Sequence, residues 1–299
     1  MVCGLWQIPT WRHIKGGYSR RRRALRRAIL EPLLVGKPVL RDTVMHALAD
    51  RGHLVFCQNG DVSFFVDPSD RVVGAWLMWH GGYQRREIDK AISVLAENGR
   101  LSADAVFVDI GANIGTHTVY ALRSGQFTRA VAFEPEPKNA RLLAMNMEAN
   151  GVANVVTVVP KAAGEATGTA TLYLHPRNKG AHALGRSPSV DGQEQFEVPV
   201  VRVEDVLAEC GVEERVGLLW VDVEGHELHV MRGLKRLLAR GVPISFEYTP
   251  QQHSDEAKRE ITALLGAHYT QIRSLNDPSR RLPISALLTT QNMDDFLAF

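Results

Sequence analysis

The alternation of apolar runs with helical patterns from residue 105 onward is what most constrains the fold of this chain. Five runs are apolar almost throughout: AVFVDI (105–110), RAVAFE (129–134), NVVTVV (154–159), GLLWVDV (217–223) and VPISFEY (242–248). Helical patterns separate most of them, at about 115–124, 137–150, 226–240 and 254–266. Strands that are apolar on both sides and joined by helices predict an α/β protein with a mostly parallel sheet, covered by helices on both faces.

Upstream of this alternation, the sequence predicts a hairpin and a helix. Asn59-Gly60 lies between the apolar runs HLVFC and VSFFV, which is typical of a β-hairpin. The segment QRREIDKAISVLAEN (84–98) then places apolar residues at helical spacing, and this helix should end at Gly99.

The later part of the chain departs from the alternation. TATLYLH and QFEVPVVRV predict strands on either side of the polar loop 177–194. A loop of this length in a compact domain is usually functional or disordered. YTQIRSL (269–275) and ISALLTT (284–290) are predicted as the last two strands. They leave no room for a crossover helix, so they should be antiparallel.

Length and charge indicate one large domain with an extension. We expect a basic, mainly helical extension over 1–52 and the main domain over 53–299, with a hairpin and lead-in helix over 53–103 and the sheet core over 104–290. Residues 1–41 carry ten Lys/Arg and one acid, so most of the positive charge lies there. The cluster Arg20–Arg27 could contact nucleic acid, anionic lipid or an acidic partner. A solvated helix face is favoured, because no aromatic residues are interleaved for base stacking.

Cysteine usage and hydropathy exclude several classes of protein. The three cysteines lack C-x-x-C spacing, so neither a disulfide framework nor a zinc site is indicated. No run approaches the roughly 20 apolar residues of a transmembrane helix. The first residues lack the order of charges and apolar residues found in a signal peptide. A cytoplasmic, reduced protein is therefore expected.

One short segment, VFVDIGANIGTHT (106–118), joins a predicted strand to a predicted helix through a glycine turn. Asp109 precedes the turn and should point toward its mouth, and Gly111 and Gly115 lie four residues apart within it. Glu134 ends the next strand, where an acid can accept both hydroxyls of a ribose. The turn lacks the three glycines of a pyrophosphate site, and Asp109 would repel phosphate. The segment therefore favours S-adenosylmethionine (SAM), which is cationic and carries no phosphate, over a nicotinamide dinucleotide.

Further ionisable residues follow the later strands. In VVPKAAGEATG, small residues would let an adenine lie flat and Glu165 could accept its amine, although an ordinary surface acid fits equally well. WVDVEGHE brings Asp222, Glu224 and His226 to the mouth of the sheet, and ISFEYTP adds Glu247. Asp222 could bind the amino group of SAM and Glu224 could face the acceptor. The two carboxylates could hold a divalent metal, but no metal site is predicted.

Four segments together resemble the FkbM-type SAM-dependent methyltransferases: VFVDIGANIGTHTVYAL, VAFEPEPKNARLL, VPVVRVEDVL and LLWVDVEGHELHVMRGL. VDPSDRVVGAWLMWHGGYQRREI is similar to the lead-in segment of that family, so the resemblance covers roughly residues 53–250. It implies a class I (Rossmann-like) methyltransferase fold, with a seven-stranded, mostly parallel sheet, an antiparallel last strand, and an N-terminal helical and hairpin extension. It also implies methyl transfer to an acceptor oxygen.

The resemblance also assigns cofactor contacts. The implied contacts are Asp109, Gly111, Asn113 and Gly115 for the methionine portion, Glu134 for the ribose, Ala163 and Glu165 for the adenine, and Asp222 for the sulfonium. The segment NKGAH (178–182) is similar to an active-site cover, in a looser match. The first fifty residues have no counterpart in the family.

We therefore expect a SAM-dependent O-methyltransferase (EC 2.1.1) acting on a hydroxyl of a small molecule, a sugar, or a glycolipid- or polyketide-type acceptor. A protonated hydroxyl is a poor nucleophile, so a nearby base would help. The candidates, in order, are His226, His182 and Glu247, with Glu224 facing the acceptor. Histidines titrate near neutrality, which suits the task. A divalent metal would serve the same purpose, but none is indicated.

Three alternatives stay open at this point. A nicotinamide dehydrogenase would share Glu134. A nucleic-acid or protein methyltransferase would use the Arg20–Arg27 cluster, although a nucleic-acid acceptor is disfavoured because the motifs for base amines and for cytosine C5 are missing. A SAM-binding module without catalysis is the third. The sequence leaves the oligomeric state open.

Overall fold

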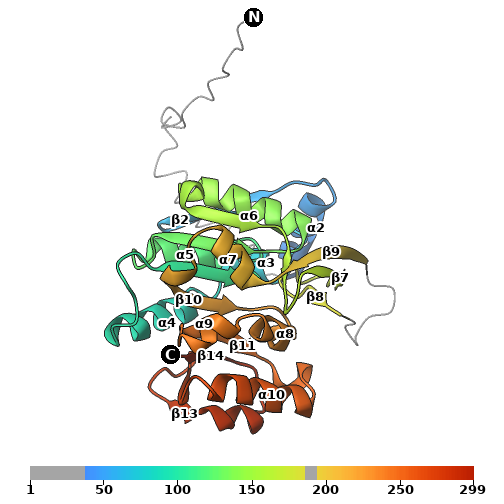
Figure 1. Cartoon of the computed structure of the whole chain (residues 1–299). Coiled ribbons are helices and arrows are strands. Elements are labelled where there is room, and N and C mark those ends of the chain that lie inside the picture. Colours follow the sequence, from blue (N-terminus) through green and yellow to red (C-terminus); the bar gives the residue numbers. More distant parts are fainter. Residues whose placement is uncertain (1–37, 186–193) are drawn as a thin grey trace, which may run out of the picture. The chain divides into compact units, whose positions relative to one another are not determined.

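The computed structural model describes residues 38–185 and 194–299 (Figure 1). Its contacts divide the chain into Met1–Gly52 and His53–Phe299, which are considered separately. In the described part of the first unit, helix α2 (Pro38–Ala49) begins at a proline, which suits the first turn of a helix. The Arg20–Arg27 cluster lies outside the described residues. Its role and the predicted domain boundaries stay predictions.

An eight-stranded sheet forms the core of the second unit, in the order β13-β12-β14-β11-β10-β3-β4-β5. The parallel strands are β3 (Val106–Ile110), β4 (Arg129–Phe133), β5 (Val156–Val159), β10 (Val216–Val221) and β11 (Ile244–Tyr248). Strand β14 (Asp294–Ala298) runs antiparallel to β11, and β12 (Gln271–Ser274) lies between β14 and the edge strand β13 (Arg281–Pro283). The predicted class I sheet, mostly parallel with an antiparallel last strand, is confirmed, and the short β13 is an addition to it.

Helices cover both faces of the sheet, because successive side chains of a strand point to opposite sides. In β3, Val106, Val108 and Ile110 join one apolar core and Phe107 joins the other. The first core includes α7 (Val203–Glu209), α8 (Glu227–Arg232), α9 (Lys235–Ala239) and α10 (Asp255–Gly266). The second includes α3 (Val73–His80), α4 (Arg85–Glu97), α5 (Thr116–Arg123) and α6 (Pro137–Ala149). The predicted helix over 226–240 is thus two helices, α8 and α9.

The predicted hairpin is present as β1 (Val55–Asn59) and β2 (Val62–Val66), and it is fastened to α6. The Asn146 side chain accepts a hydrogen bond from the Phe65 amide at 2.6 Å and donates to the Phe65 carbonyl at 3.2 Å. Asn150 pairs in the same way with the backbone of Ser63. The Asn146 amide also donates to the carbonyl of Ile114 at 2.8 Å, so the hairpin is linked to the glycine turn.

A small second sheet contains the two strands predicted beside the polar loop. Its strands, in the order β6-β9-β7-β8, are β6 (Ala162–Ala163), β7 (Gly168–Tyr173), β8 (Ala183–Leu184) and β9 (Gln195–Val201). The part of the loop before β8 is held by side chains of the main domain. Asn139 donates to the Lys179 carbonyl at 3.0 Å, and the Lys179 amide donates to Asp70 at 3.4 Å.

The prediction for the end of the chain is partly wrong. YTQIRSL does contain a strand, β12, but ISALLTT contains a 3₁₀ helix, η5 (Ile284–Leu288). Its buried residues Ile284 and Leu287 are three apart, which is a helical rather than an alternating spacing. The last strand is β14 instead, beyond the predicted end of the sheet core at residue 290. In Figure 1 it lies with β13 at the side of the sheet opposite α6.

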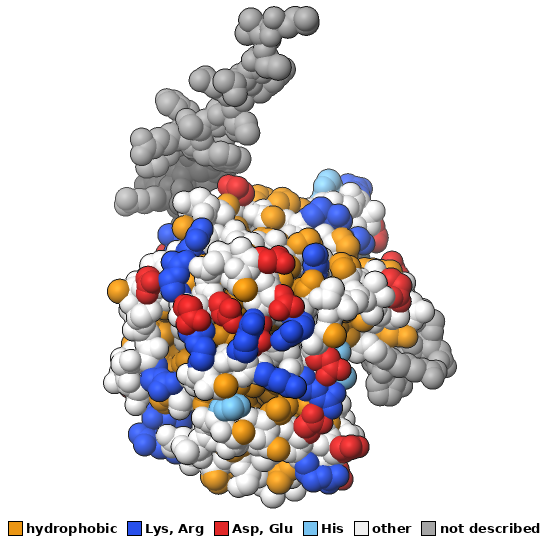
Figure 2. All heavy atoms as spheres, viewed as in Figure 1, with side chains coloured by type: hydrophobic (Ala, Val, Ile, Leu, Met, Phe, Trp, Pro, Cys, Tyr) orange, Lys and Arg blue, Asp and Glu red, His pale blue; other side chains and the backbone are white. Residues whose placement is uncertain are grey.

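Acidic and basic side chains are mixed over the face shown in Figure 2. Acidic and basic side chains also form ion pairs in the second unit, for example Arg232–Glu260 at 2.6 Å and Arg240–Glu214 at 3.1 Å. Exposed pairs of this type contribute little to stability individually. Within residues 38–185 and 194–299, no helix is both long and apolar enough to cross a bilayer.

Candidate functional site

Two adjoining cavities lie at the carboxyl ends of the parallel strands. The first, which we call the turn cavity, is lined by Gly111, Asn113, Glu134, Lys161, Ala163, Lys179, His182, Asp222 and their neighbours. The second, which we call the acidic cavity, is lined by Tyr83, Gln84, Asn113, His117, Gly180, Asp222, Glu224, Glu247 and their neighbours. Both share Gly111, Asn113, Gly180 and Asp222. The strand ends therefore form one continuous site with two compartments.

The glycine turn requires both of its glycines. Gly111 has φ +90°, and a Cβ there would lie 1.8 Å from the carbonyl oxygen of Asp222. Gly115 has φ +88°, and a Cβ there would lie 2.5 Å from a methyl carbon of Leu143 on α6. Asn113 between them also has a positive φ, of 51°. The glycine spacing is therefore set by close packing against the end of β10 and against α6.

Glu134 supports the turn from the end of β4. One of its carboxylate oxygens accepts from the amide of Asn113 and the other from the amide of Glu136, both at 2.8 Å. The side chain lines the turn cavity although the residue is only 5% exposed. Burial raises its pKa to about 8, against the opposing effect of these amide donors. Each oxygen keeps a further lone pair, which can accept a hydroxyl of a ligand.

The structure corrects the predicted direction of Asp109. Its side chain is fully buried and lines neither cavity. The Thr118 hydroxyl on α5 donates to one carboxylate oxygen at 2.5 Å, and within the described part of the chain the other oxygen has no hydrogen-bond partner. Burial raises the pKa of Asp109 to about 7. Asp109 thus anchors α5 behind the turn.

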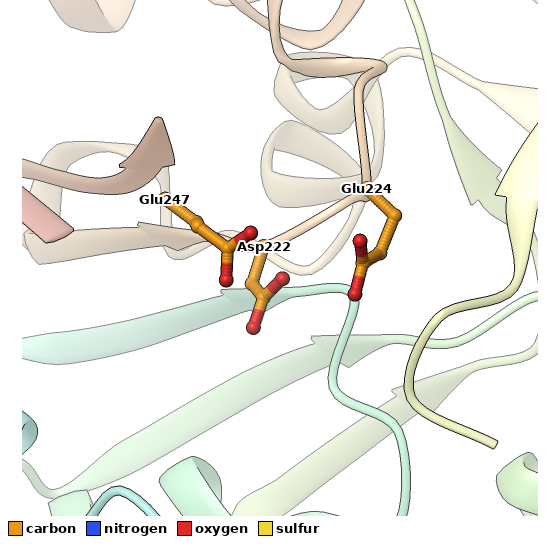
Figure 3. Close-up of side chains that lie close together, drawn as sticks. All are labelled: Asp222, Glu224 and Glu247. Carbon is orange, nitrogen blue, oxygen red and sulfur yellow. The ribbon is translucent and has the colours of Figure 1, made fainter. Parts of the chain in front are cut away.

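Three carboxylates meet at the acidic cavity (Figure 3). Asp222 and Glu224 follow β10, Glu247 lies on β11, and one oxygen from each is within 4.8 Å of the others. Gln252 donates to Glu224 at 3.2 Å and Thr249 to Glu247 at 3.1 Å. Burial first, and then repulsion from the other two, raises the pKa of Asp222 well above its usual range. Across 38–185 and 194–299, no Lys, Arg or His forms an ion pair with the three.

Neither histidine proposed as a base is suitably placed. His226 lines neither cavity, and its ring stacks on His229 with the ring centres 4.4 Å apart. His182 lines the turn cavity, but its Nδ1 accepts from the amide of His175 at 2.9 Å. In the neutral ring the proton is then on Nε2, which can donate but not accept. Burial lowers the pKa of each to about 4.

The two residues expected at the adenine have different positions. Ala163 lies on β6 and lines the turn cavity. Glu165 does not line it: its carboxylate is half-exposed and pairs with Arg232 at 3.4 Å. Glu165 was suggested by its position along the chain and by the family resemblance. Its exposure and its ion pair with Arg232 instead fit the alternative, an ordinary surface acid.

Sequence reasoning missed several residues that line the cavities. Lys161 lies on the turn cavity, and Tyr83, Gln84 and His117 lie on the acidic cavity. His117 directly follows the glycine turn, which could have indicated it. Tyr83 and Gln84 follow Gly81-Gly82, about thirty residues before the turn, and no pattern in the sequence indicated that they return to it.

Comparison with known proteins identifies the family. The methyltransferase FkbM domain matches residues 109–276, which is 168 of the 299 residues. The chain belongs to the FkbM methyltransferase family. This membership argues against the dehydrogenase alternative. The match begins at Asp109 and includes the glycine turn, Glu134 and the three carboxylates of the acidic cavity.

Relatives in the family differ in their named substrates. The chain is 31% identical over 150 residues to Methyltransferase 1 of Beauveria bassiana, covering 44% of this chain and 59% of that protein. It is 31% identical over 201 residues to the 31-O-demethyl-FK506 methyltransferase FkbM of Streptomyces tacrolimicus (58% and 75%). It is 28% identical over 177 residues to the hexuronic acid methyltransferase AglP of Haloferax volcanii (58% and 67%). The chain spans about three fifths of the length of the first of these relatives.

Among solved structures, a putative SAM-dependent methyltransferase from Streptococcus mutans matches with a TM-score of 0.43 at 12% identity, covering 82% of this chain and 55% of that one. An O-methyltransferase from Bacillus cereus matches with a TM-score of 0.36 at 12% identity, covering 71% and 90%.

Gly111→Ala should lower the free energy of unfolding by more than about 3 kcal/mol, because the new Cβ overlaps the Asp222 carbonyl and the φ angle is unfavourable. Gly151→Ala is the matched control, since Gly151 also has a positive φ but nothing within 4 Å of an added Cβ. It should cost about 1–2 kcal/mol. Urea unfolding measures both. Equal losses would show that the close approach to Asp222 is not tight.

Asp109→Asn should change how stability depends on pH. The folded-state pKa of Asp109 is raised from 3.8 to about 7, so the stability contributed by its protonated form is complete below about pH 4 and is lost as the pH rises through 7. The Asp109→Asn variant keeps an acceptor for the Thr118 hydroxyl, and its stability does not fall in this way as the pH rises because the amide does not ionise. Relative to wild type it should therefore gain up to a few kcal/mol between about pH 4 and pH 7 in urea unfolding. If the free energies of unfolding of wild type and variant change in parallel with pH, the raised pKa of the buried Asp109 carboxyl is contradicted.

Proposed function

We propose that this FkbM-family protein takes its methyl group from SAM and transfers it to a hydroxyl oxygen of a sugar or another small-molecule acceptor. The observation that carries the proposal is the shared wall of the two cavities. Gly111, Asn113 and Asp222 border both the compartment that contains Glu134 and the compartment that contains the three carboxylates. A cofactor in the first can therefore present its reactive end to an acceptor in the second.

The residues of the turn cavity fit SAM. Glu134 offers two oxygens with free lone pairs, as the two ribose hydroxyls require. Ala163 gives a small apolar wall for an adenine. The buried side-chain oxygen of Asn113 has no hydrogen-bond partner in the described structure and can accept from a ligand. SAM, when bound, supplies an electrophilic methyl group on a positively charged sulfur, and Asp222 provides negative charge between the compartments.

On the acceptor side, the chain has to orient an oxygen and deal with its proton. In-line transfer forms the new carbon–oxygen bond while the carbon–sulfur bond breaks with its electron pair left on sulfur, so geometry contributes much of the rate. The hydroxyl proton must leave. His226 and His182 are unsuitably placed to take this proton. The other two predicted catalytic residues, Glu224 and Glu247, border the acidic cavity. We assign the handling of the hydroxyl to this carboxylate cluster.

The names of relatives support oxygen as the acceptor atom. The Streptomyces enzyme is named for the 31-O position of FK506, and a 28% identical relative from Sinorhizobium fredii is named a 2-O-methyltransferase. The Haloferax relative is named for a hexuronic acid. These names are the basis for proposing a sugar or small-molecule hydroxyl as the acceptor of this chain.

Calorimetric titration with SAM should show binding, and titration with NAD should give no heat. Glu134→Gln should weaken SAM binding by about 1–3 kcal/mol, because glutamine offers the ribose hydroxyls one acceptor oxygen instead of two. Glu165→Gln should bind SAM like wild type, since Glu165 lies outside the turn cavity. Melting curves check that the variants are folded, which matters because Glu134 also holds the turn. A folded wild-type protein that does not bind SAM would overturn the proposed function.

With isotopically labelled SAM and a panel of hydroxylated acceptors, including hexuronic acids, the label should appear as a methyl ether. Nuclear magnetic resonance of the product locates it. Glu247→Gln should lower kcat by about 10²–10⁴-fold while SAM affinity stays within about twofold. Label found on nitrogen or as a carboxylate ester would contradict transfer to a hydroxyl.

A further inference from the structure

We propose that Asp222, Glu224 and Glu247 bind one divalent cation of the Mg²⁺, Mn²⁺ or Ca²⁺ class on the acceptor side of the site. As a binding site the proposal depends only on the geometry of this chain. Its use in methyl transfer rests on the proposed function, where the cation would hold the acceptor oxygen.

The positions of the carboxylates match the size of such an ion. One oxygen from each side chain lies within 4.8 Å of the others, and Figure 3 shows the three side chains converging from the turn after β10 and from β11. Ligands on opposite sides of Ca²⁺ are about 5 Å apart, and those of Mg²⁺ about 4 Å. One ion can therefore contact all three with small side-chain rotations.

The charge of the cluster is not balanced within the described structure. The side-chain donors to it are the neutral groups of Gln252 and Thr249, on Glu224 and Glu247. The residues nearby add to the negative charge, since Asp295 and Glu227 also repel Asp222. Buried carboxylates are normally paired or coordinate a metal, because desolvating several like charges together is costly.

A second, independent observation comes from other side chains that line the acidic cavity. His117 is only 4% exposed, it lines this cavity, and its Nε2 has no hydrogen-bond partner in the described structure. Gln84 also lines this cavity, and its buried side-chain oxygen likewise has no hydrogen-bond partner in the described structure. Buried polar atoms are rarely left unpaired, and hydrated cations present water molecules that bond to such surrounding groups. The unpaired atoms suit the water shell of an ion held by the carboxylates.

The ligand set indicates which cations fit. Three carboxylates offer hard oxygen ligands, with no thiolate in either cavity. Mg²⁺, Ca²⁺ and Mn²⁺ prefer such ligands, whereas zinc and copper sites generally use histidine or cysteine. His117 is not among the groups close enough to bind the same ion directly, so it belongs to the surrounding layer.

The alternative occupant of the carboxylate cluster is the positively charged part of SAM itself. The two differ in a measurable way. A cation site that is separate from the cofactor should stay available when the cofactor product S-adenosylhomocysteine is bound, whereas a cluster that serves the cofactor should be closed to metal.

The test is titration of Mn²⁺ into the full chain after removal of metals, followed by electron paramagnetic resonance and calorimetry without SAM. We expect one Mn²⁺ per chain with a dissociation constant below about 1 mM, and competition by Mg²⁺. Glu224→Gln and Glu247→Gln should each weaken Mn²⁺ binding at least about tenfold. Glu148→Gln, an exposed acid on α6, should leave it unchanged. Binding should persist with saturating S-adenosylhomocysteine.

Three results would overturn the cation site: no Mn²⁺ bound by folded wild-type protein, equal binding by the glutamine variants, or loss of Mn²⁺ when S-adenosylhomocysteine is added. A SAM titration of the same metal-free protein keeps the two proposals apart. SAM binding without Mn²⁺ binding removes the cation and leaves the proposed function, and Mn²⁺ binding without SAM binding does the reverse.

Discussion

The close approach of the Gly111 backbone to the Asp222 carbonyl is the contact on which the site depends. It joins the end of β3 to the end of β10 with no space for a side chain between them. Because the two strand ends touch, Gly111 and Asp222 both line the turn cavity and the acidic cavity, and the two cavities share a wall. A side chain at residue 111 would push the two strand ends apart and would also move the two compartments apart. This one position therefore constrains both the sheet packing and the geometry of the cofactor site.

Buried acids surround this contact, and each is accommodated differently. Asp109 has one hydroxyl donor and is stabilised as the neutral acid. Glu134 accepts two backbone amides and can bind a ligand without losing either. Among the described residues, the side-chain donors to the carboxylates of the acidic cavity are neutral, so this cluster lacks a positively charged partner there. Of these acids, Glu134 has the most backbone hydrogen bonds in the described structure.

The sheet could be predicted from the sequence because apolar strands and intervening helices are local patterns. The turn and its glycines could be predicted too, since they follow directly from that alternation. Side-chain directions were harder. Phe107 packs on the second face, and Asp109 is two residues further along the same strand, so strand parity places it under α5 with Thr118. Applying this rule would have corrected its predicted direction.

Other misses have a different physical cause. His226 and Glu165 were judged by their closeness to strand ends in the sequence, but loop residues leave the sheet in directions that spacing does not determine. His226 stacks on His229, three residues along in the helix that it precedes, and Glu165 pairs with Arg232, which is distant in sequence. The last strand was missed because Asp294 and Asp295 are the first two of its five residues, which leaves only a short apolar run. Ile284 and Leu287 resemble a strand until their three-residue spacing is considered.

The hairpin fastened by Asn146 has a consequence for what counts as the smallest intact form of this fold. All the strands of the main sheet come after residue 105, and the hairpin forms a separate two-stranded sheet. Yet the Asn146 side chain, which is fully buried, divides its hydrogen bonds between Phe65 of the hairpin and Ile114 of the glycine turn. A chain shortened to the sheet would leave that amide half-satisfied beside the turn, and would lose rigidity where the cofactor-binding geometry is set. The hairpin is therefore part of the foundation of the site.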